Sequence, residues 1–144
     1  MSRPAPCPDL FHEPEGQPPL IALVRLAALS CRAGRRGPAP ACAAIDPDAP
    51  VEDLIVALAK ALPEALHRRP VIWRPGAAGR SFDEDWLLAL AAALRAADAD
   101  SVRFLLGRRV RPVAGPMLRS LVRRLDARLH AVETAALETA HAAD

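Results

Sequence analysis

Apolar residues recur at helical spacing along most of the chain after residue 19, and this pattern is the first guide to the fold. Between residues 20 and 31 nearly every position is apolar, which predicts a helix that is buried on most sides. A second helix is expected to begin near Asp48, whose carboxylate would cap it, with Pro50 in its first turn. Pro63 is expected to kink or split this helix, because proline lacks the N–H that a helical hydrogen bond needs. Its inward stripe consists of Val51, Leu54, Ile55, Leu58, Leu62 and Leu66.

The third predicted helix has the clearest start. Ser81 and Glu84 have the spacing of a capping box, in which the serine hydroxyl and the glutamate carboxylate each accept a backbone N–H. A stripe of large apolar residues follows, and alanines on the other side leave room for neighbouring helices, so we expect this helix to be central. The stripe is Phe82, Trp86, Leu87, Leu90 and Leu94, and the alanines are Ala89, Ala92, Ala93 and Ala96.

Two further helices complete the predicted fold. One runs from about Ser101 to Arg109, with Ser101 as its first residue and Gly107 loosening its end, and the other spans roughly residues 113–142. Five helical segments without a convincing strand predict an all-α fold, a compact bundle of about five helices. The inward residues are Val102, Leu105 and Leu106 in the fourth helix and Leu118, Leu121, Val122, Leu125, Leu129 and Val132 in the fifth.

The segments outside these helices are rich in proline and glycine. Residues 1–19 hold six prolines and are expected to form an irregular, flexible arm, which leaves residues 20–144 as a single helical domain. Residues 32–50 are expected to form a long loop, and residues 67–80 another irregular segment. Within the latter, residues 71–73 are too few to found a sheet.

Charge is distributed unevenly, although the net charge is only +2. Eight arginines lie between residues 103 and 128, where Asp126 is the only acid, and an acidic segment, residues 81–100, precedes them. Such asymmetry indicates either ion pairs within the protein or an acidic partner. The acidic partner is a protein surface in one interpretation and nucleic acid in another. On the last helix, Arg119 and Arg123 lie on one flank and Arg124 and Arg128 on the other.

A second candidate site is the segment from His67 to Arg74, where cations surround an indole. Arginine beside tryptophan can bind phosphate, stack a base or anchor a protein interface, while in the alternative interpretation Trp73 closes the core and the arginines extend into water. We therefore expect one partner-binding surface that combines this segment with the last two helices. Its candidate residues are Arg68, Arg69, Trp73, Arg74, Arg108, Arg109, Arg111, Arg119, Arg123, Arg124 and Arg128.

The cysteines favour a reducing compartment. Their number is odd and their spacing irregular, so we expect a cytoplasmic protein without disulfides. Export as a lipoprotein would need the run 20–29 to act as a signal, but Arg25 interrupts it and acids precede it. The run is also too short to span a bilayer. Zinc bound by Cys7, His12, Cys31 and Cys42 is disfavoured because no Cys-x2-Cys pair exists, so we expect no metal or cofactor.

The sequence contains no recognisable catalytic motif. The segment 74–81 resembles a phosphate-binding loop only superficially, because Arg74 and Arg80 stand where that motif needs glycine and lysine. The serines lack the context of a nucleophile, and the close carboxylates stand at helix starts, where acids are stabilising. The sequence therefore favours a non-enzymatic adaptor, accessory or regulatory protein that binds an acidic protein surface. The alternatives are a nucleic-acid-binding regulator that uses the same basic face and a small enzyme whose active site cannot be recognised from the sequence.

Overall fold

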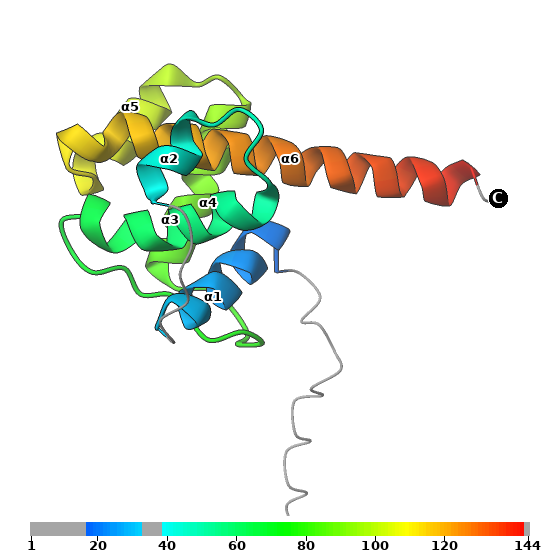
Figure 1. Ribbon diagram of the computed structural model, residues 1–144, viewed down its shortest axis with the longest axis horizontal. Coiled ribbons are helices and arrows are strands. Elements are labelled where there is room, and N and C mark those ends of the chain that lie inside the picture. The colour runs from blue at the N-terminus through cyan, green and yellow to red at the C-terminus, as the bar shows by residue number, and fades with distance from the viewer. Residues whose placement is uncertain (1–16, 33–38, 143–144) are drawn as a thin grey trace, which may run out of the picture.

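The computed structural model describes residues 17–32 and 39–142 and has an all-α fold (Figure 1). Within these ranges there are six α-helices and one short 3₁₀ helix, and no strand. Most of the predicted arm, residues 1–19, lies outside the described residues, and its last residue is the first of α1. The elements are α1 (Pro19–Arg32), α2 (Pro40–Ile45), α3 (Val51–Ala65), α4 (Phe82–Arg95), α5 (Ala99–Arg109), the 3₁₀ helix η1 (Pro112–Ala114) and α6 (Gly115–Ala142).

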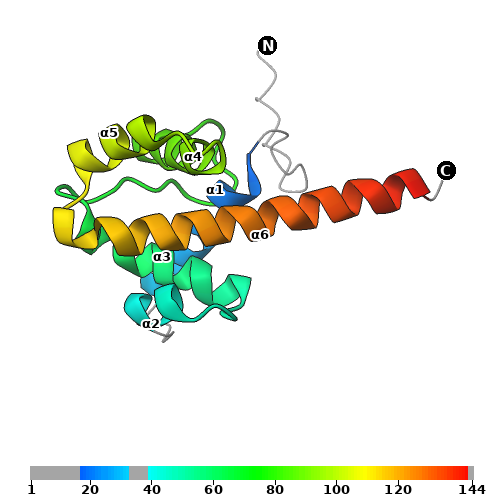
Figure 2. The ribbon, with the colours of Figure 1, turned by 90° about the horizontal axis from the view of Figure 1, so that it is seen from above.

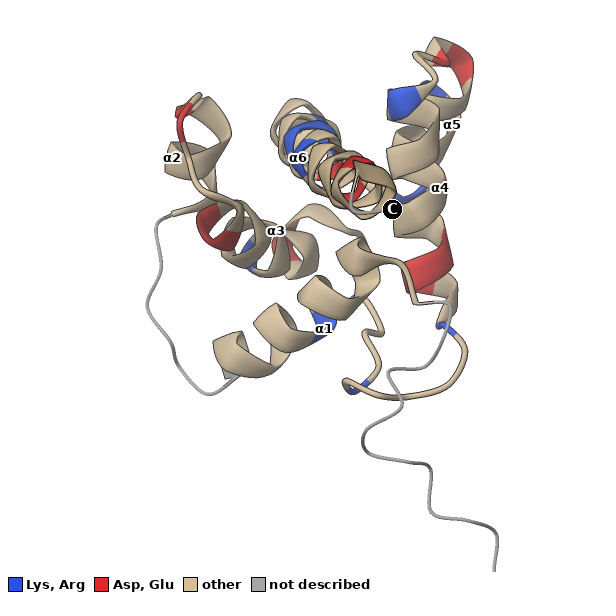
Figure 3. Ribbon diagram, turned by 90° about the vertical axis from the view of Figure 1, so that its right-hand side faces the viewer, with Lys and Arg blue, Asp and Glu red and all other residues tan. Residues whose placement is uncertain are grey.

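The long helix α6 is the centre of the bundle. Helices α4 and α5 lie on one side of it and α2 and α3 on the other, and α1 packs mainly against α3 (Figures 2 and 3). The expectation that the helix of residues 82–95 is central is therefore wrong. The apolar stripe of α6 is wide enough to pack against helices on both sides, and its fully buried members are Leu118, Leu121, Val122 and Leu125.

Helix α1 is buried on one face only, which corrects the prediction for residues 20–31. Leu26 and Leu29 are about half exposed, while Ile21 and Val24 are buried against the rest of the bundle. Arg25, a charged residue inside the apolar run, is fully buried. The nearly uniform apolar pattern therefore overstated how much of this helix is covered.

The predicted loop of residues 32–50 contains the short helix α2, which the sequence pattern did not reveal. Pro40 fits its first turn, where a missing N–H has no consequence. The next helix, α3, begins at Val51 with Pro50 as its cap residue, so the prediction that Asp48 caps it is wrong. Pro63 does not split α3, because it lies in the last turn and the helix ends two residues later.

Helix α4 begins with the predicted capping box. Ser81 Oγ accepts the Glu84 N–H at 3.1 Å, and Glu84 Oε1 accepts the Ser81 N–H at 2.9 Å. Trp86 is buried as predicted, and its Nε1–H donates to the Leu105 carbonyl at 3.1 Å. Phe82, however, is 76% exposed, because the inward positions of this first turn are occupied by Asp83 and Glu84 instead.

The segment between α3 and α4 is irregular, as predicted, and residues 71–73 form no strand. One antiparallel bridge joins Leu66, just after α3, to Val110, just after α5. Helix α5 starts at Ala99, earlier than predicted, because the Asp98 side chain caps it and accepts the Ser101 N–H at 3.2 Å. The bridge fixes the end of α5 beside the end of α3 and so positions the start of α6.

Candidate functional site: an arginine-lined groove between α5 and α6

The predicted basic residues separate into a group with internal partners and a group without. Arg124 and Arg128, on one flank of α6, donate hydrogen bonds to backbone carbonyls at the end of α2 and in the turn that follows it. A helix leaves its last carbonyls without intrahelical partners, so these guanidinium groups stabilise the packing of α2 against α6. The acceptors are the carbonyl oxygens of Ala43, Ala44 and Asp46 for Arg124 and of Pro47 and Ala49 for Arg128.

Arg109 also has an internal role. Its guanidinium pairs with the Asp83 carboxylate and lies 5.1 Å and 5.3 Å from the ring centroids of Phe82 and Trp86. Asp83 Oδ2 in turn accepts the Val71 N–H at 2.7 Å. This cluster joins the end of α5 to the start of α4 and to the irregular segment, so Arg109 contributes to packing.

Three further arginines each contact an acidic or aromatic side chain. Arg95, at the end of α4, forms a bidentate ion pair with Asp126 of α6, in which Nη2 and Nε donate to the two carboxylate oxygens at 2.7 Å and 3.0 Å. This hydrogen bond, with a smaller effect of Glu133, raises the pKa of Arg95. Arg103 lies 4.0 Å from Asp100 on the exposed side of α5. Arg108 lies 5.5 Å from the centroid of the exposed Phe104 ring.

Arg111, Arg119 and Arg123 are exposed, and their guanidinium groups make no hydrogen bond or ion pair with any described residue. They lie beside two adjoining cavities of about 540 Å³ and 370 Å³, which share Leu106, Gly115 and Arg119 in their walls. We name the joined cavities the α5–α6 groove. Figure 3, which looks along α6 from its C-terminal end, marks the Lys and Arg positions of α6 between α2 and α5.

The α5–α6 groove combines an apolar floor with a cationic rim. The partly buried Leu106 supplies apolar surface, with the buried Val102 and Val110 behind it, and no acidic side chain is among the residues that line either cavity. Uncompensated guanidinium groups around an apolar floor create a positive potential and donate paired N–H groups to carboxylates or phosphates. The cationic side chains of the rim are Arg103, Arg111, Arg119 and Arg123, with His67 at one end.

The segment 67–80 does not share this groove beyond His67. Arg69 lines a different cavity, of about 620 Å³, between α1 and α3. Trp73 is about one third exposed and lies over Gly79 of its own segment, so it neither fills the core nor stands free. Arg68 and Arg74 are exposed, and their side chains make no hydrogen bond or ion pair with a described residue. The structure therefore separates two clusters that the sequence interpretation joined into one surface.

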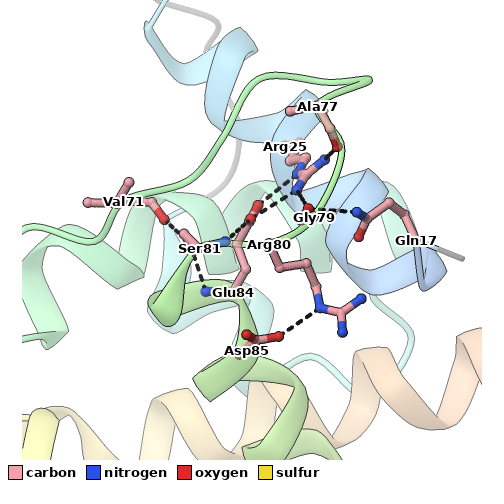
Figure 4. A network of polar contacts seen from close by, with 9 residues as sticks. All are labelled: Gln17, Arg25, Val71, Ala77, Gly79, Arg80, Ser81, Glu84 and Asp85. Atoms are coloured by element: carbon pink, nitrogen blue, oxygen red, sulfur yellow. Dashed lines mark hydrogen bonds and ion pairs between the residues drawn. The ribbon is translucent and has the colours of Figure 1, made fainter. Parts of the chain in front are cut away.

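Arg25 and Glu84 form a buried ion pair that the sequence interpretation missed (Figure 4). Arg25 Nε and Nη2 donate to the two carboxylate oxygens at 2.7 Å and 3.0 Å, and the remaining donors reach the carbonyls of Ala77 and Gly79. Burial by itself raises the pKa of the Glu84 carboxyl, but the hydrogen bonds from Arg25 and the Ser81 N–H outweigh it and hold the pKa below its ordinary value. A lone arginine in an apolar run was the available signal, because buried charges are almost always paired.

Other candidate chemistry finds little support among the described residues. Ser81 caps α4, Ser101 donates to the carboxylate of Asp98 and Ser120 donates to the Ala44 carbonyl at 3.3 Å. No group of three or more possible metal ligands occurs in the described ranges, where Cys31 and Cys42 are free thiols. The other two zinc-ligand candidates, Cys7 and His12, lie outside the described residues.

Comparisons of this chain with models of protein families, with curated proteins and with solved structures find no match. Within residues 17–32 and 39–142, no helix combines the length and the apolar character needed to cross a membrane. Inferences about function therefore start from the geometry of the α5–α6 groove.

Proposed function

We propose that this protein is a non-enzymatic adaptor or accessory protein, and that its α5–α6 groove binds an acidic segment of a partner protein. One observation carries the proposal: the guanidinium groups of Arg111, Arg119 and Arg123 have no partner among the described residues and meet at a groove whose lining holds no acid. The arginines of the opposite flank of α6 are used for packing, so the unpaired ones are a distinct set. The odd number of cysteines supports placing the protein in the cytoplasm.

The floor of the groove favours a protein segment as the occupant. Leu106, which is only partly buried, offers apolar surface between the guanidinium groups, and this matches a helix that carries both apolar and acidic side chains. Nucleic acid would use the same cations, but the groove lining holds no Phe, Tyr or Trp ring on which a base could stack, only the smaller imidazole of His67 at one end. Phe104, beside Arg108, is the aromatic residue that a nucleic-acid interface would use instead.

The proposal is tested with a labelled synthetic helix that has glutamates on one face and leucines on the other. Fluorescence anisotropy should detect binding that weakens with salt, because the rim charges are exposed. Reversing Arg119→Glu and Arg123→Glu together should weaken binding at least about tenfold, or about 1.4 kcal/mol. The same helix with lysine in place of glutamate, and a labelled single-stranded oligonucleotide, are the comparison ligands.

A matched control separates the groove from general charge. The pair Arg68→Glu and Arg74→Glu alters net charge by the same amount at exposed, unpaired positions outside the groove. It should leave the affinity within about threefold, because screened charges act over roughly a Debye length. Equal losses in the two pairs would refute the groove as the binding site. Tighter binding of the oligonucleotide than of the acidic helix would favour the nucleic-acid alternative.

A further inference from the structure

The C-terminal part of α6 extends beyond the other helices of the bundle (Figures 1 and 2). We name residues 130–142 the overhang, and every one of them is exposed. The apolar side chains Val132 and Leu137 are 65% and 68% exposed, although Leu129, one residue before the overhang, still packs against the core. Thirteen helical residues span about 20 Å, which is long enough to lie along another helix.

The overhang carries the charge that the groove lacks. Its charged residues are Glu133 and Glu138, and no lysine or arginine follows Arg128 in the chain. The N-terminal half of the same helix provides Arg119 and Arg123 to the groove. Helix α6 is therefore cationic at one end and acidic at the other.

The two ends share one face of α6. With 3.6 residues per turn, the directions of Arg119, Arg123 and Leu137 fall within a sector of about 40°. Glu133 and Glu138 flank this sector, one on each side, by the same geometry. Arg124 and Arg128 point to the other flank, toward α2, where they bind backbone carbonyls. This face is therefore cationic near its start and flanked by acids near its end.

Antiparallel packing of two such faces places each of the two arginines opposite a glutamate of the second copy. Arg123 then faces Glu133 of the second copy and Arg119 faces its Glu138, because the arginines are about 6 Å apart along the axis and the glutamates about 7.5 Å. A twofold axis near residue 128 repeats both pairs, which is the self-complementarity that a symmetric dimer needs. The overhang of one copy then lies along the α5–α6 groove of the other.

We infer that an occupant of the α5–α6 groove is the overhang of a second copy of this chain, docked antiparallel along α6. This inference rests on the proposed function, since it uses the same groove for an acidic segment. Leu137 of the second copy then meets the apolar surface around Leu106, and a partner's acidic segment competes with self-association. A straight helix cannot fold back on itself, so the overhang cannot fill its own groove.

Charge reversal in the full-length chain tests the inference. The groove variant carries Arg119→Glu and Arg123→Glu, and the overhang variant carries Glu133→Arg and Glu138→Arg. Sedimentation velocity of the wild type should show a dimer that dissociates on dilution and in high salt. Each variant alone should dimerise at least about tenfold more weakly, because acids then face acids or arginines face arginines. An equimolar mixture of the two should dimerise again, since both contacts of the mixed dimer pair opposite charges.

Four outcomes would overturn the inference. The first is a wild type that stays monomeric at the highest soluble concentration, and the second is a mixture that does not restore the dimer. The third is an overhang variant that dimerises like the wild type. The fourth is loss of the dimer in the control pair Arg68→Glu and Arg74→Glu. Thermal unfolding of each variant, monitored by circular dichroism, verifies that the variants are folded. A variant that fails to fold is replaced by the facing single substitutions, Arg123→Glu and Glu133→Arg, which are tested alone and mixed in the same way.

The overhang variant also separates this inference from the proposed function. Its groove is intact and, if the inference holds, unoccupied, so it should bind the acidic helix at least as tightly as the wild type. A monomeric wild type that binds the acidic helix would refute self-docking and leave the proposed function standing. If neither the wild type nor the overhang variant binds the acidic helix, the proposed function fails, and self-docking fails with it.

Discussion

Replacing Arg25 with methionine should destabilise the fold strongly, because this arginine is buried together with its counter-ion. The Arg25 and Glu84 side chains are 1% and 0% exposed, and two hydrogen bonds of 2.7 Å and 3.0 Å join them. In the variant, the carboxylate stays buried with only backbone N–H donors. Breaking one side of a buried ion pair costs about 3–5 kcal/mol. The hydrogen bonds from Arg25 to Ala77 and Gly79, which hold the irregular segment, are lost as well.

Urea unfolding of four proteins measures this effect: the wild type, Arg25→Met, Glu84→Gln and the double variant. Glutamine keeps an acceptor for the capping box, so Glu84→Gln removes the charge and leaves the helix start intact. The double variant should be more stable than Arg25→Met, because it contains no unpaired buried charge. The coupling between the two substitutions should be about 1–3 kcal/mol.

The same pair predicts how stability depends on pH. The folded protein holds the pKa of Glu84 below its ordinary value of 4.5, so the unfolded chain binds this proton more readily. The contribution of Glu84 is therefore fully present above pH 4.5 and is lost as the pH falls through the folded pKa. Glu84→Gln should lose less stability than the wild type over that range.

Two results would refute this reasoning. A loss below about 1 kcal/mol in Arg25→Met would show that the guanidinium is not committed to the pair, since such values are typical of surface positions. Additive effects of Arg25→Met and Glu84→Gln would show that the two side chains do not interact.

Two other predictions concern side chains with contrasting surroundings. Trp86→Ala should cost about 3–5 kcal/mol in urea unfolding, because the indole is 6% exposed and its removal leaves a large cavity; a loss below about 1 kcal/mol would contradict its burial. Arg124→Ala should cost about 1–3 kcal/mol, because it leaves the Ala43 carbonyl without its donor and removes one donor from the Ala44 carbonyl, whereas Arg119→Ala should change stability by less than about 0.5 kcal/mol. Equal effects of the two arginine substitutions would contradict the division into packing and groove residues.

The parts of the fold that could be predicted are those with a strong local signal. The spacing of Ser81 and Glu84 located the start of α4, because a capping box depends only on residues within one turn. Long apolar stripes located α3 and α6. Helix α2 was not predicted, because six residues form no stable helix alone. Its stability comes from α6, whose side chains bind the carbonyls at its end. No pattern within residues 32–50 contains that information.

The orientation of individual side chains was less predictable. Periodicity placed Phe82 inward, but Asp83 and Glu84 take the inward directions because they bind Arg109 and Arg25 from distant segments. An apolar residue is thus exposed and two acids are buried at the start of α4. Helical spacing alone cannot distinguish this arrangement from the reverse, since the partners lie at least 26 residues away.

The candidate site, too, could be predicted only in part, because the contacts between distant segments are not visible in the sequence. The sequence correctly separated the arginines of α6 into two flanks, yet it could not say which flank meets another element, because α2 was unknown. Once α2 is placed, Arg124 and Arg128 have backbone partners, and their charges no longer indicate an external ligand. Within the described part of the chain, no acid lines the groove beside Arg119 and Arg123, while the acidic overhang lies at the opposite end of the same helix. A single chain cannot bring these two ends of α6 together, whereas an antiparallel second copy places the acidic end of one helix beside the groove of the other.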